Sequence, residues 1–249
     1  SGVKKIYSNG NAFAALKNDG SVVTWGYESS GGNSDSVKEL LSSGVNQIFS
    51  NRYAFAALKD DGSVVTWGSA NTGGDSSQVS ESLKSGITNI YSATGYSYNG
   101  DFRAAFAALK DDGSVVSWGH SDLLGDNYAE FQDELKSGVK KIVPGGRGFA
   151  LLKDNGSVIY FGKDSAESYF NQIKDQVLWG VSDVVSNGYA FLAFKESSSS
   201  AIAWNEYETQ NNYGGDTSEV EEQLKSDIAL IANTDKKMTI NNILESDDS

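Results

Sequence analysis

His120 is the single histidine of the 249-residue sequence, and Asp122 follows it two positions later. An imidazole beside a carboxylate could act as a general base. The pair comes directly after a Trp-Gly step, and related segments of the chain place residues of different chemistry at this point, namely Tyr27, Ser69 and Lys163. Such free exchange is typical of a solvated loop, so we predict no catalytic residue here. The absence of cysteine excludes disulfides, thiolate metal sites and thiol catalysis.

Aspartate-rich turns could hold a hard cation, which takes oxygen ligands. Four such pairs recur along the chain: Asn18-Asp19, Asp60-Asp61, Asp111-Asp112 and Asp154-Asn155. Each offers at most two carboxylates on a tight hairpin and lacks the alternating ligand spacing of a calcium loop, whereas turn chemistry alone accounts for them. The run 145–148 resembles part of a phosphate loop but precedes a predicted strand instead of a helix. We therefore predict neither a metal nor a cofactor.

Binding residues are predicted in the third of the related segments, where a loop between two strands is nine residues longer than its counterparts. This loop contains Tyr96, Tyr98, Asn99, Asp101, Phe102 and Arg103. Exposed Tyr and Arg on a rigid frame are the usual anchors of a protein-binding surface. Counterpart loops on the same rim carry Arg52, Tyr53, Arg147 and Tyr189. Two interpretations stay open: a shared binding patch, or a long loop packed onto its neighbours by its own aromatic side chains.

An aromatic residue also recurs once in each segment, as Trp25, Trp67, Trp118, Phe161 and Trp204. A row of indoles could stack on sugars. An aromatic residue at repeat spacing more often belongs to the core, and a phenylalanine in one copy favours packing. We predict that this series is core.

These residues are positioned by an internal repeat, because the segment AFAALKDDGSVVTWG at 54–68 recurs almost unchanged at 12–26 and 105–119. Alignment on equivalent β-branched residues divides the chain into copies 3–44, 45–86, 87–138, 139–180, 181–227 and a partial copy 228–249. A unit of about forty residues cannot bury its own apolar face and must stack on its neighbours. The sequence therefore predicts a single repeat domain over 1–249.

The second copy shows the unit most clearly. Its β-branched and aromatic residues predict three strands, at 45–50, 54–58 and 63–67, and Gly62 allows a tight turn between the last two. Asp75 resembles the start of a capping box, and Val79 and Leu83 on one face predict a short helix. Because three antiparallel strands finish at the end of the sheet opposite to the one where they began, this helix must return the chain. The loop between strands one and two then shares a rim with the loop after each Trp.

Copies of the form Ala-Phe-Ala-Ala-Leu-Lys-Asp-Asp-Gly-Ser-Val-Val-Thr-Trp-Gly resemble the repeats of the regulator of chromosome condensation (RCC1-like) superfamily. They are most similar to its short three-stranded branch, which includes the β-lactamase inhibitor protein II. The resemblance covers essentially the whole chain. It implies blades of a β-propeller and action through protein partners bound at a loop-built face, without catalysis. The copy number and the helix after each Trp depart from the family pattern.

We predict an all-β fold with short repeat helices: a β-propeller-like array of about six three-stranded blades, each followed by a short helix. The last copy stops before its third strand. The alternative is an open solenoid of three strands and a helix per copy.

The 20 basic and 33 acidic side chains leave a net charge of -13, which repels phosphate backbones and anionic lipid. We predict neither nucleic-acid binding nor membrane insertion, and we favour a non-enzymatic protein-binding scaffold that acts through the strand 1–2 loop rim. The alternatives are a structural subunit that self-assembles or joins a larger complex, and a glycan-binding lectin. The acidic, cysteine-free, Gly- and Ser-rich composition favours an extracellular or cell-surface location.

Overall fold

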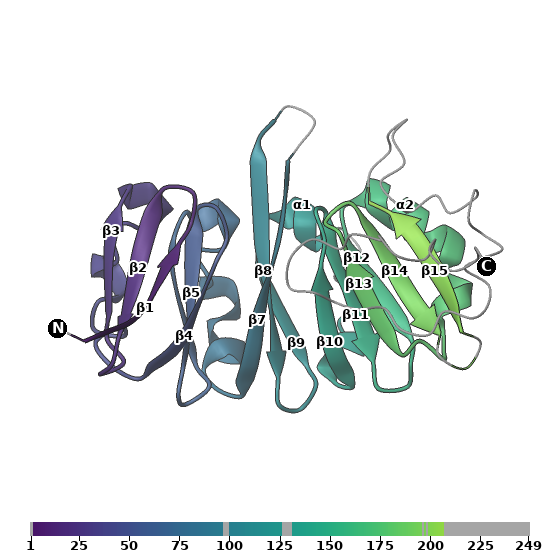
Figure 1. The fold of residues 1–249 in the computed structure, drawn as a ribbon, viewed down its shortest axis with the longest axis horizontal. Coiled ribbons are helices and arrows are strands. Elements are labelled where there is room, and N and C mark those ends of the chain that lie inside the picture. The colour runs from purple at the N-terminus through teal and green to yellow at the C-terminus, as the bar shows by residue number, and fades with distance from the viewer. Residues whose placement is uncertain (1, 97–99, 126–130, 196, 198, 207–249) are drawn as a thin grey trace, which may run out of the picture.

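The computed structural model describes residues 2–96, 100–125, 131–195, 197 and 199–206, and these residues form five three-stranded antiparallel sheets (Figure 1). In every sheet the strands lie in chain order, so the middle strand pairs with both neighbours. The strands are β1 (Val3–Ser8), β2 (Ala12–Lys17), β3 (Val22–Gly26), β4 (Val45–Ser50), β5 (Ala54–Lys59), β6 (Val64–Gly68), β7 (Ile87–Tyr96), β8 (Phe102–Lys110), β9 (Val115–Gly119), β10 (Val139–Pro144), β11 (Gly148–Lys153), β12 (Val158–Gly162), β13 (Asp183–Ser186), β14 (Ala190–Lys195) and β15 (Ser200–Asn205). The predicted all-β array of three-stranded blades is confirmed.

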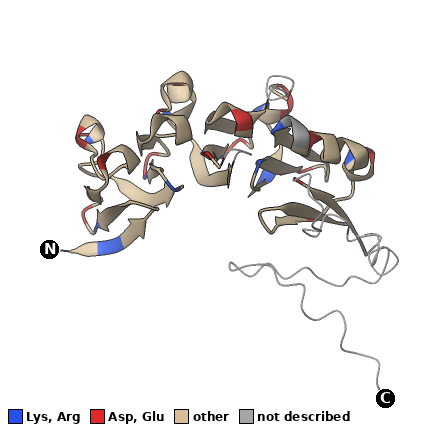
Figure 2. Cartoon of the chain, turned by 90° about the horizontal axis from the view of Figure 1, so that it is seen from above, with Lys and Arg blue, Asp and Glu red and all other residues tan. Residues whose placement is uncertain are grey.

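Each sheet lies within one of the first five predicted copies. The partial copy 228–249 lies outside the described residues, and the single-domain organisation over 1–249 stays a prediction. Viewed from above, the five sheets follow an arc whose ends are the first and the fifth sheet (Figure 2).

The turn between the second and third strands is built as the sequence predicts. In the second sheet Gly62 has a φ of 75°, which is the left-handed region that favours glycine. Asp61 Oδ1 accepts hydrogen bonds from the Ser63 backbone N–H (2.9 Å) and from the Ser63 hydroxyl (2.6 Å). The same contacts recur at Asp19, Asp112 and Asn155. These side chains therefore serve the turn itself.

The links between sheets differ from the predicted helix. In the first three copies the segment where the helix was predicted forms short 3-10 turns: η2 (Asp35–Val37), η4 (Ser77–Leu83) and η6 (Glu134–Lys136). After the third sheet's last strand comes a single helical turn, α1 (Ser121–Leu124), and after the fourth comes a ten-residue α-helix, α2 (Asp164–Ile173). Serine explains the difference in the second copy, because its hydroxyl competes for backbone groups and disfavours an extended α-helix. The link of the fifth copy lies outside the described residues.

The core lies between the sheets, where four hydrophobic clusters join each sheet to the next. Between the first two sheets, Ala12 and Ala14 of β2 meet Phe55 of β5 and Trp67 of β6, and Leu41 of the link packs beside them. Successive residues of a strand point to opposite faces. The middle strand therefore turns small side chains toward the following sheet and its phenylalanine toward the preceding one.

The recurring aromatic series belongs to this core, as predicted, in sheets two to five. Trp67, Trp118, Phe161 and Trp204 are at most 4% exposed, whereas Trp25 of the first sheet is 44% exposed. The indole also has a polar role that packing alone does not predict. Trp67 Nε1–H donates to the Gly31 carbonyl (3.1 Å) and Trp118 Nε1–H donates to the Gly73 carbonyl (3.0 Å), so each bond ties one sheet to the loop of the sheet before it.

Candidate protein-binding rim

The loops between first and second strands share a rim with the residues that follow each third strand. One backbone hydrogen bond fixes this arrangement in every described sheet: the N–H after the third strand donates to the carbonyl just before the second strand or, in the third sheet, to Ala104 within the lengthened β8. The five bonds join Tyr27 to Asn11, Ser69 to Tyr53, His120 to Ala104, Lys163 to Arg147 and Glu206 to Tyr189, at 2.9, 2.8, 2.9, 2.9 and 2.9 Å. The shared rim predicted from strand parity is thus confirmed.

Asparagine side chains stiffen this rim. Asn51 Oδ1 accepts from the backbone N–H groups of Tyr53 and Ala54 at 3.0 Å each, and its amide donates to the Thr72 carbonyl at 2.6 Å. Asn9 and Asn187 accept the equivalent pairs of backbone bonds. A loop whose backbone donors are satisfied in this way presents its side chains on a fixed frame.

The insertion of the third copy continues the hairpin, where the sequence predicted a longer loop between the two strands. Beyond the usual end of the sheet, β7 and β8 add cross-strand pairs from Ala93 with Ala105 to Tyr96 with Phe102. The hairpin rises above the rim of the other sheets (Figure 1). Small Ala and Gly residues between the paired backbones, together with β-branched Thr94, are compatible with this extension. Tyr98 and Asn99 lie outside the described residues, and Asp101 is exposed beside the hairpin end.

Four predicted residues meet where this hairpin leans on the second sheet: Arg52, Tyr53, Tyr96 and Phe102, which we name the Arg52 cluster. The Phe102 ring lies edge-on to Tyr53 and to Tyr96, with centroids 5.0 and 5.5 Å apart. The Arg52 guanidinium lies 5.5 to 6.0 Å from all three rings and also donates a hydrogen bond to the Tyr96 hydroxyl. Cation–π and edge-to-face contacts of this kind each stabilise by roughly 0.5–1.5 kcal/mol.

The interpretation in which aromatic side chains pack the insertion onto its neighbour describes part of this cluster, and the shared binding patch stays a prediction. Phe102 and Tyr53 are half-buried and pack the hairpin onto its neighbour, whereas Arg52 is exposed and Tyr96 is 52% exposed. The cluster is therefore a packed base with an exposed tyrosine and guanidinium on top.

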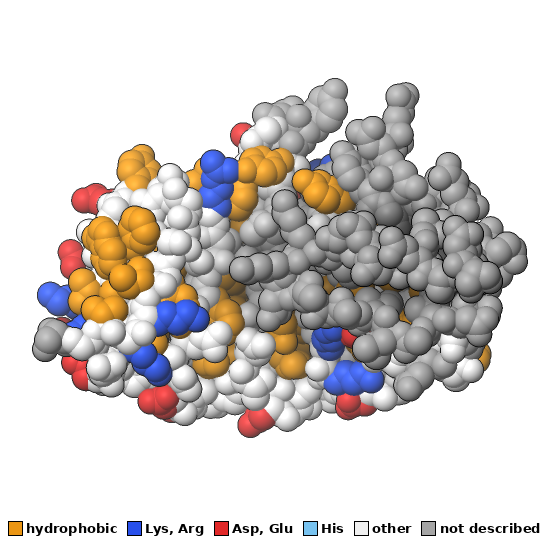
Figure 3. Space-filling model, in the orientation of Figure 1, with side chains coloured by type: hydrophobic (Ala, Val, Ile, Leu, Met, Phe, Trp, Pro, Cys, Tyr) orange, Lys and Arg blue, Asp and Glu red, His pale blue; other side chains and the backbone are white. Residues whose placement is uncertain are grey.

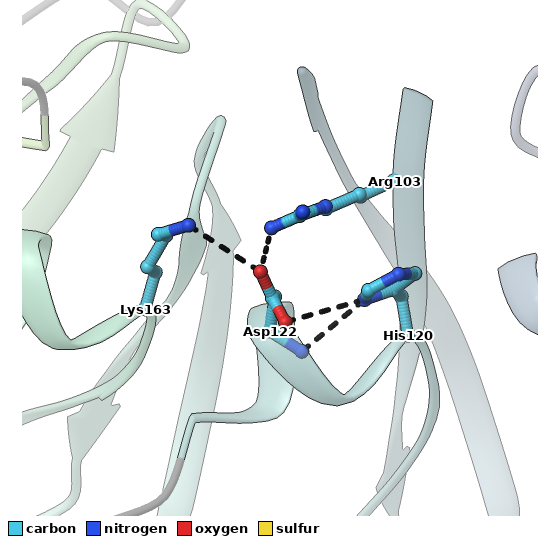
Figure 4. Close-up of polar contacts among 4 residues, drawn as sticks. All are labelled: Arg103, His120, Asp122 and Lys163. Carbon is cyan, nitrogen blue, oxygen red and sulfur yellow. Dashed lines mark hydrogen bonds and ion pairs between the residues drawn. The ribbon is translucent and has the colours of Figure 1, made fainter. Parts of the chain in front are cut away.

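Arg103 lies apart from the Arg52 cluster and faces the fourth sheet (Figure 4). It forms an ion pair with Asp122, whose carboxylate also receives Lys163 Nζ at 3.3 Å. His120 Nδ1 accepts a hydrogen bond from the Asp122 backbone N–H at 3.2 Å, and its distance to Asp122 Oδ1 is 3.8 Å. Sequence reasoning did not group these four residues, because Lys163 belongs to the next copy.

This ion-pair group has little of the chemistry of a general base. Burial lowers the pKa of His120, and the charges of Arg103 and Lys163 lower it further. Because Nδ1 accepts a backbone N–H, it does not donate to Asp122, as it would in a catalytic dyad. Two cations, Arg103 and Lys163, hold the Asp122 carboxylate.

The remaining predicted residues lie further along the rim. Arg147 is half-buried in the loop between β10 and β11, and its backbone N–H donates to Glu206. Tyr189 is 48% exposed in the loop between β13 and β14. Neither belongs to the Arg52 cluster, so the eight predicted residues that the structure describes do not all lie in one cluster.

Glu206 is a rim residue that sequence reasoning missed. It is fully buried, and its carboxylate accepts hydrogen bonds from the N–H groups of Gly146 (2.6 Å) and Arg147 (3.1 Å) and from the Tyr160 hydroxyl (3.0 Å). Burial raises the pKa of Glu206 to about 7, although these hydrogen bonds and the charge of Arg147 act in the opposite direction.

The signal for this residue is a missing asparagine. The loop position that holds Asn51 in the second sheet holds Gly145 in the fourth. A Cβ atom at Gly145 would lie 2.3 Å from Glu206 Oε2, so the carboxylate occupies the space of the absent side chain. Glu206 thus supplies from the fifth sheet the acceptor that the fourth sheet's own loop lacks.

Within the described part of the chain, no group of three or more His, Asp or Glu side chains is placed to hold a metal ion. No helix in that same part is long and apolar enough to cross a membrane.

No protein-family model matches this chain, and no curated protein matches it. Among solved structures it is similar to the ectodomain of the Arabidopsis thaliana receptor kinase ACR4 (16% identity, TM-score 0.44, 82% of this chain and 63% of that chain). It is similar to human WBSCR16 (17%, 0.44, 82% and 61%) and to yeast RCC1 (Prp20) in a complex with Kap60 (17%, 0.47, 82% and 56%).

The chain therefore spans between about half and two thirds of the length of the first structures it matches. Yeast RCC1 also stands among the solved structures that the chain matches, and membership of the short-repeat branch stays a prediction.

Proposed function

We propose that this chain is a non-enzymatic repeat scaffold that binds a protein partner through the strand 1–2 loop rim, with the Arg52 cluster as the centre of contact. The observation that supports this most directly is the combination of packing and exposure at one point. Phe102 and Tyr53 hold the extended hairpin in place, while Tyr96 and Arg52 face solvent. Tyr and Arg on a preorganised base are the residue types that dominate binding energy at protein interfaces.

The chemistry of the cluster limits what it can receive. Its rings and guanidinium suit a protein surface that offers an apolar side chain to Tyr96 and an acceptor to Arg52. A shallow groove beside it, between the first two sheets, is lined by Tyr27, Tyr53, Asn11 and Ala70 among others. Tyr27 is 66% exposed and extends the aromatic surface along the rim.

Neither a glycan-binding nor a catalytic role gains support from the same rim. Three of the indoles that could have stacked on sugars, Trp67, Trp118 and Trp204, are buried between sheets. His120 and Asp122 are engaged with the backbone and with two cations. The non-enzymatic assignment and the extracellular location stay predictions.

The test compares capture by three immobilised chains: wild type, the double variant R52A/Y96A, and W179A. Trp179 is a matched control because it is equally aromatic, 66% exposed, and close to the turns on the opposite rim. We expect R52A/Y96A to capture about tenfold less, or still less, of the proteins that wild type and W179A capture from a native extract. This is the loss typical of two truncated hot-spot residues. Equal capture by all three chains would reject this surface.

A further inference from the structure

The outer face of the first sheet exposes the side chains that the other sheets bury. Val3, Ile6, Phe13, Val23 and Trp25 are 42–56% exposed. Their counterparts in the second sheet are Val45, Ile48, Phe55, Val65 and Trp67, which are at most 7% exposed. Figure 3 shows hydrophobic side chains gathered over this first sheet. The Phe13 and Trp25 rings are stacked with centroids 5.3 Å apart, as Phe55 and Trp67 are at 5.2 Å, so the exposed face already has the geometry of the buried ones.

The molecule itself shows what covers such a face. In the second sheet the cover is the small-residue side of β2, the link residue Leu41 and the loop at Gly31, whose carbonyl accepts the Trp67 indole N–H. The approach is close, since a Cβ at Gly31 would lie 2.7 Å from the Phe55 ring. Gly73 makes the same approach to the third sheet, where a Cβ would lie 2.6 Å from the Phe106 ring. The cover of the second and third sheets is therefore the end of a repeat that carries this Gly-Gly loop.

The sequence holds one such repeat end without an aromatic face to receive it. The run Thr72-Gly73-Gly74-Asp75 returns as Tyr213-Gly214-Gly215-Asp216, and Leu224 stands where Leu83 stands after it. The following partial copy, 228–249, contains no tryptophan and no phenylalanine. The fourth and fifth sheets are covered by copies that carry α1 and α2 in place of a Gly-Gly loop. Among the aromatic faces of the described residues, that of the first sheet is the exposed one, and the Gly-Gly loop at 214–215 is followed by no such aromatic pair.

Charge and placement favour a partner of the same kind. Residues 1–27 carry three lysines and one aspartate, whereas residues 207–249 carry ten acidic side chains and three lysines. The two ends are therefore complementary in charge. The first and fifth sheets lie at opposite ends of the arc (Figures 1 and 2).

We propose that the outer face of the first sheet binds the C-terminal end of a second copy of this chain, residues 207–249, so that copies associate head to tail. The contact repeats the one between successive sheets within the chain. An association of unlike surfaces builds open chains of copies or closes into a ring, in contrast to a two-fold dimer. The proposal is independent of the Arg52 cluster, and either can fail without the other.

The experiment is a complementation test in sedimentation velocity over a wide range of concentration. W25K disables the face, G214V disables the loop, and W179K changes an exposed tryptophan elsewhere. We expect the mass of wild type and W179K to rise with concentration, and association to weaken by about thirtyfold or more in W25K and in G214V alone. An equal mixture of W25K and G214V should form a dimer and nothing larger, since each restores the half that the other lacks.

Three results would overturn the proposal. Wild type could stay monomeric at every concentration, which indicates that no second copy binds. G214V alone could still form dimers, which indicates contact between two first-sheet faces. The W25K and G214V mixture could stay monomeric. Circular dichroism checks that each variant is folded. If W25K is not folded, V23K replaces it, because Val23 lies on the same face and is 53% exposed.

Discussion

The Glu206 carboxyl group receives three hydrogen bonds, yet its complete burial favours the protonated acid. The charged and titratable side chains that face it are Arg147 and Tyr160. Its pKa in the folded chain is about 7, against 4.5 as the ordinary value, so between these pH values the folded state binds a proton that the unfolded state has lost. The free energy of unfolding must then fall as pH rises through this window.

We expect this fall to amount to at most about 3 kcal/mol for Glu206, from the size of the shift. Because the lowered pKa of His120 acts in the opposite direction, the informative quantity is the difference between wild type and E206Q. Denaturant unfolding at pH 4.5 and pH 8 should show a pH-dependent difference between these two chains. E81Q, at a glutamate whose side chain is 82% exposed, should track wild type. A constant difference between wild type and E206Q would show that Glu206 does not titrate in this window.

At the scale of elements, the strand and turn were predictable because their signals are local. The β-branched run of β4 and the Asp-Gly-Ser turn after β5 determine backbone geometry within a few residues. The links were less predictable, because the i, i+4 spacing of Val79 and Leu83 suits an α-helix, whereas the serines between them disfavour one and the segment forms a 3-10 turn. The Arg52 cluster was predicted in its members but not in its architecture, since the pairing of Tyr96 with Phe102 depends on a hairpin that packs against another copy.

The Gly-Gly loop is the element that lets two sheets approach, and its first glycine can be tested directly. Gly73 has a φ of 97°, and a Cβ there would lie 2.6 Å from the Phe106 ring. G73A should lower the free energy of unfolding by about 2–4 kcal/mol, from backbone strain and from overpacking together. Gly188 has a φ of 86° with nothing within 4 Å of its Cβ position, so G188A should show the backbone cost alone. Equal losses in the two variants would mean that the close approach to Phe106 contributes nothing.

At the scale of the whole molecule, stability is a sum of similar sheets and the interfaces between them. The sequence indicated this from its period, but Glu206 escaped prediction because its role depends on a gap at Gly145 some sixty positions earlier. The exposed outer face of the first sheet was not predictable from the sequence either. Only the arrangement in space shows that Phe13 and Trp25 face solvent while identical residues in the next sheet are buried.

The array offers an unusually clean comparison of a terminal and an internal sheet, because β2 and β5 have the same sequence, AFAALK. Their amides therefore have the same intrinsic exchange rates, apart from the effect of the flanking residues. Each of the two strands also pairs in the same register with the first strand of its sheet, β1 or β4. The first sheet is covered on one face and the second on both, so opening the first breaks one interface and opening the second breaks two. Under monomeric conditions, native-state hydrogen exchange should be about tenfold or more faster in β2 than in β5. Equal protection would mean that the sheets open together and that the array behaves as one cooperative unit, whereas an added concentration-dependent protection of β2 alone would follow from head-to-tail association of copies.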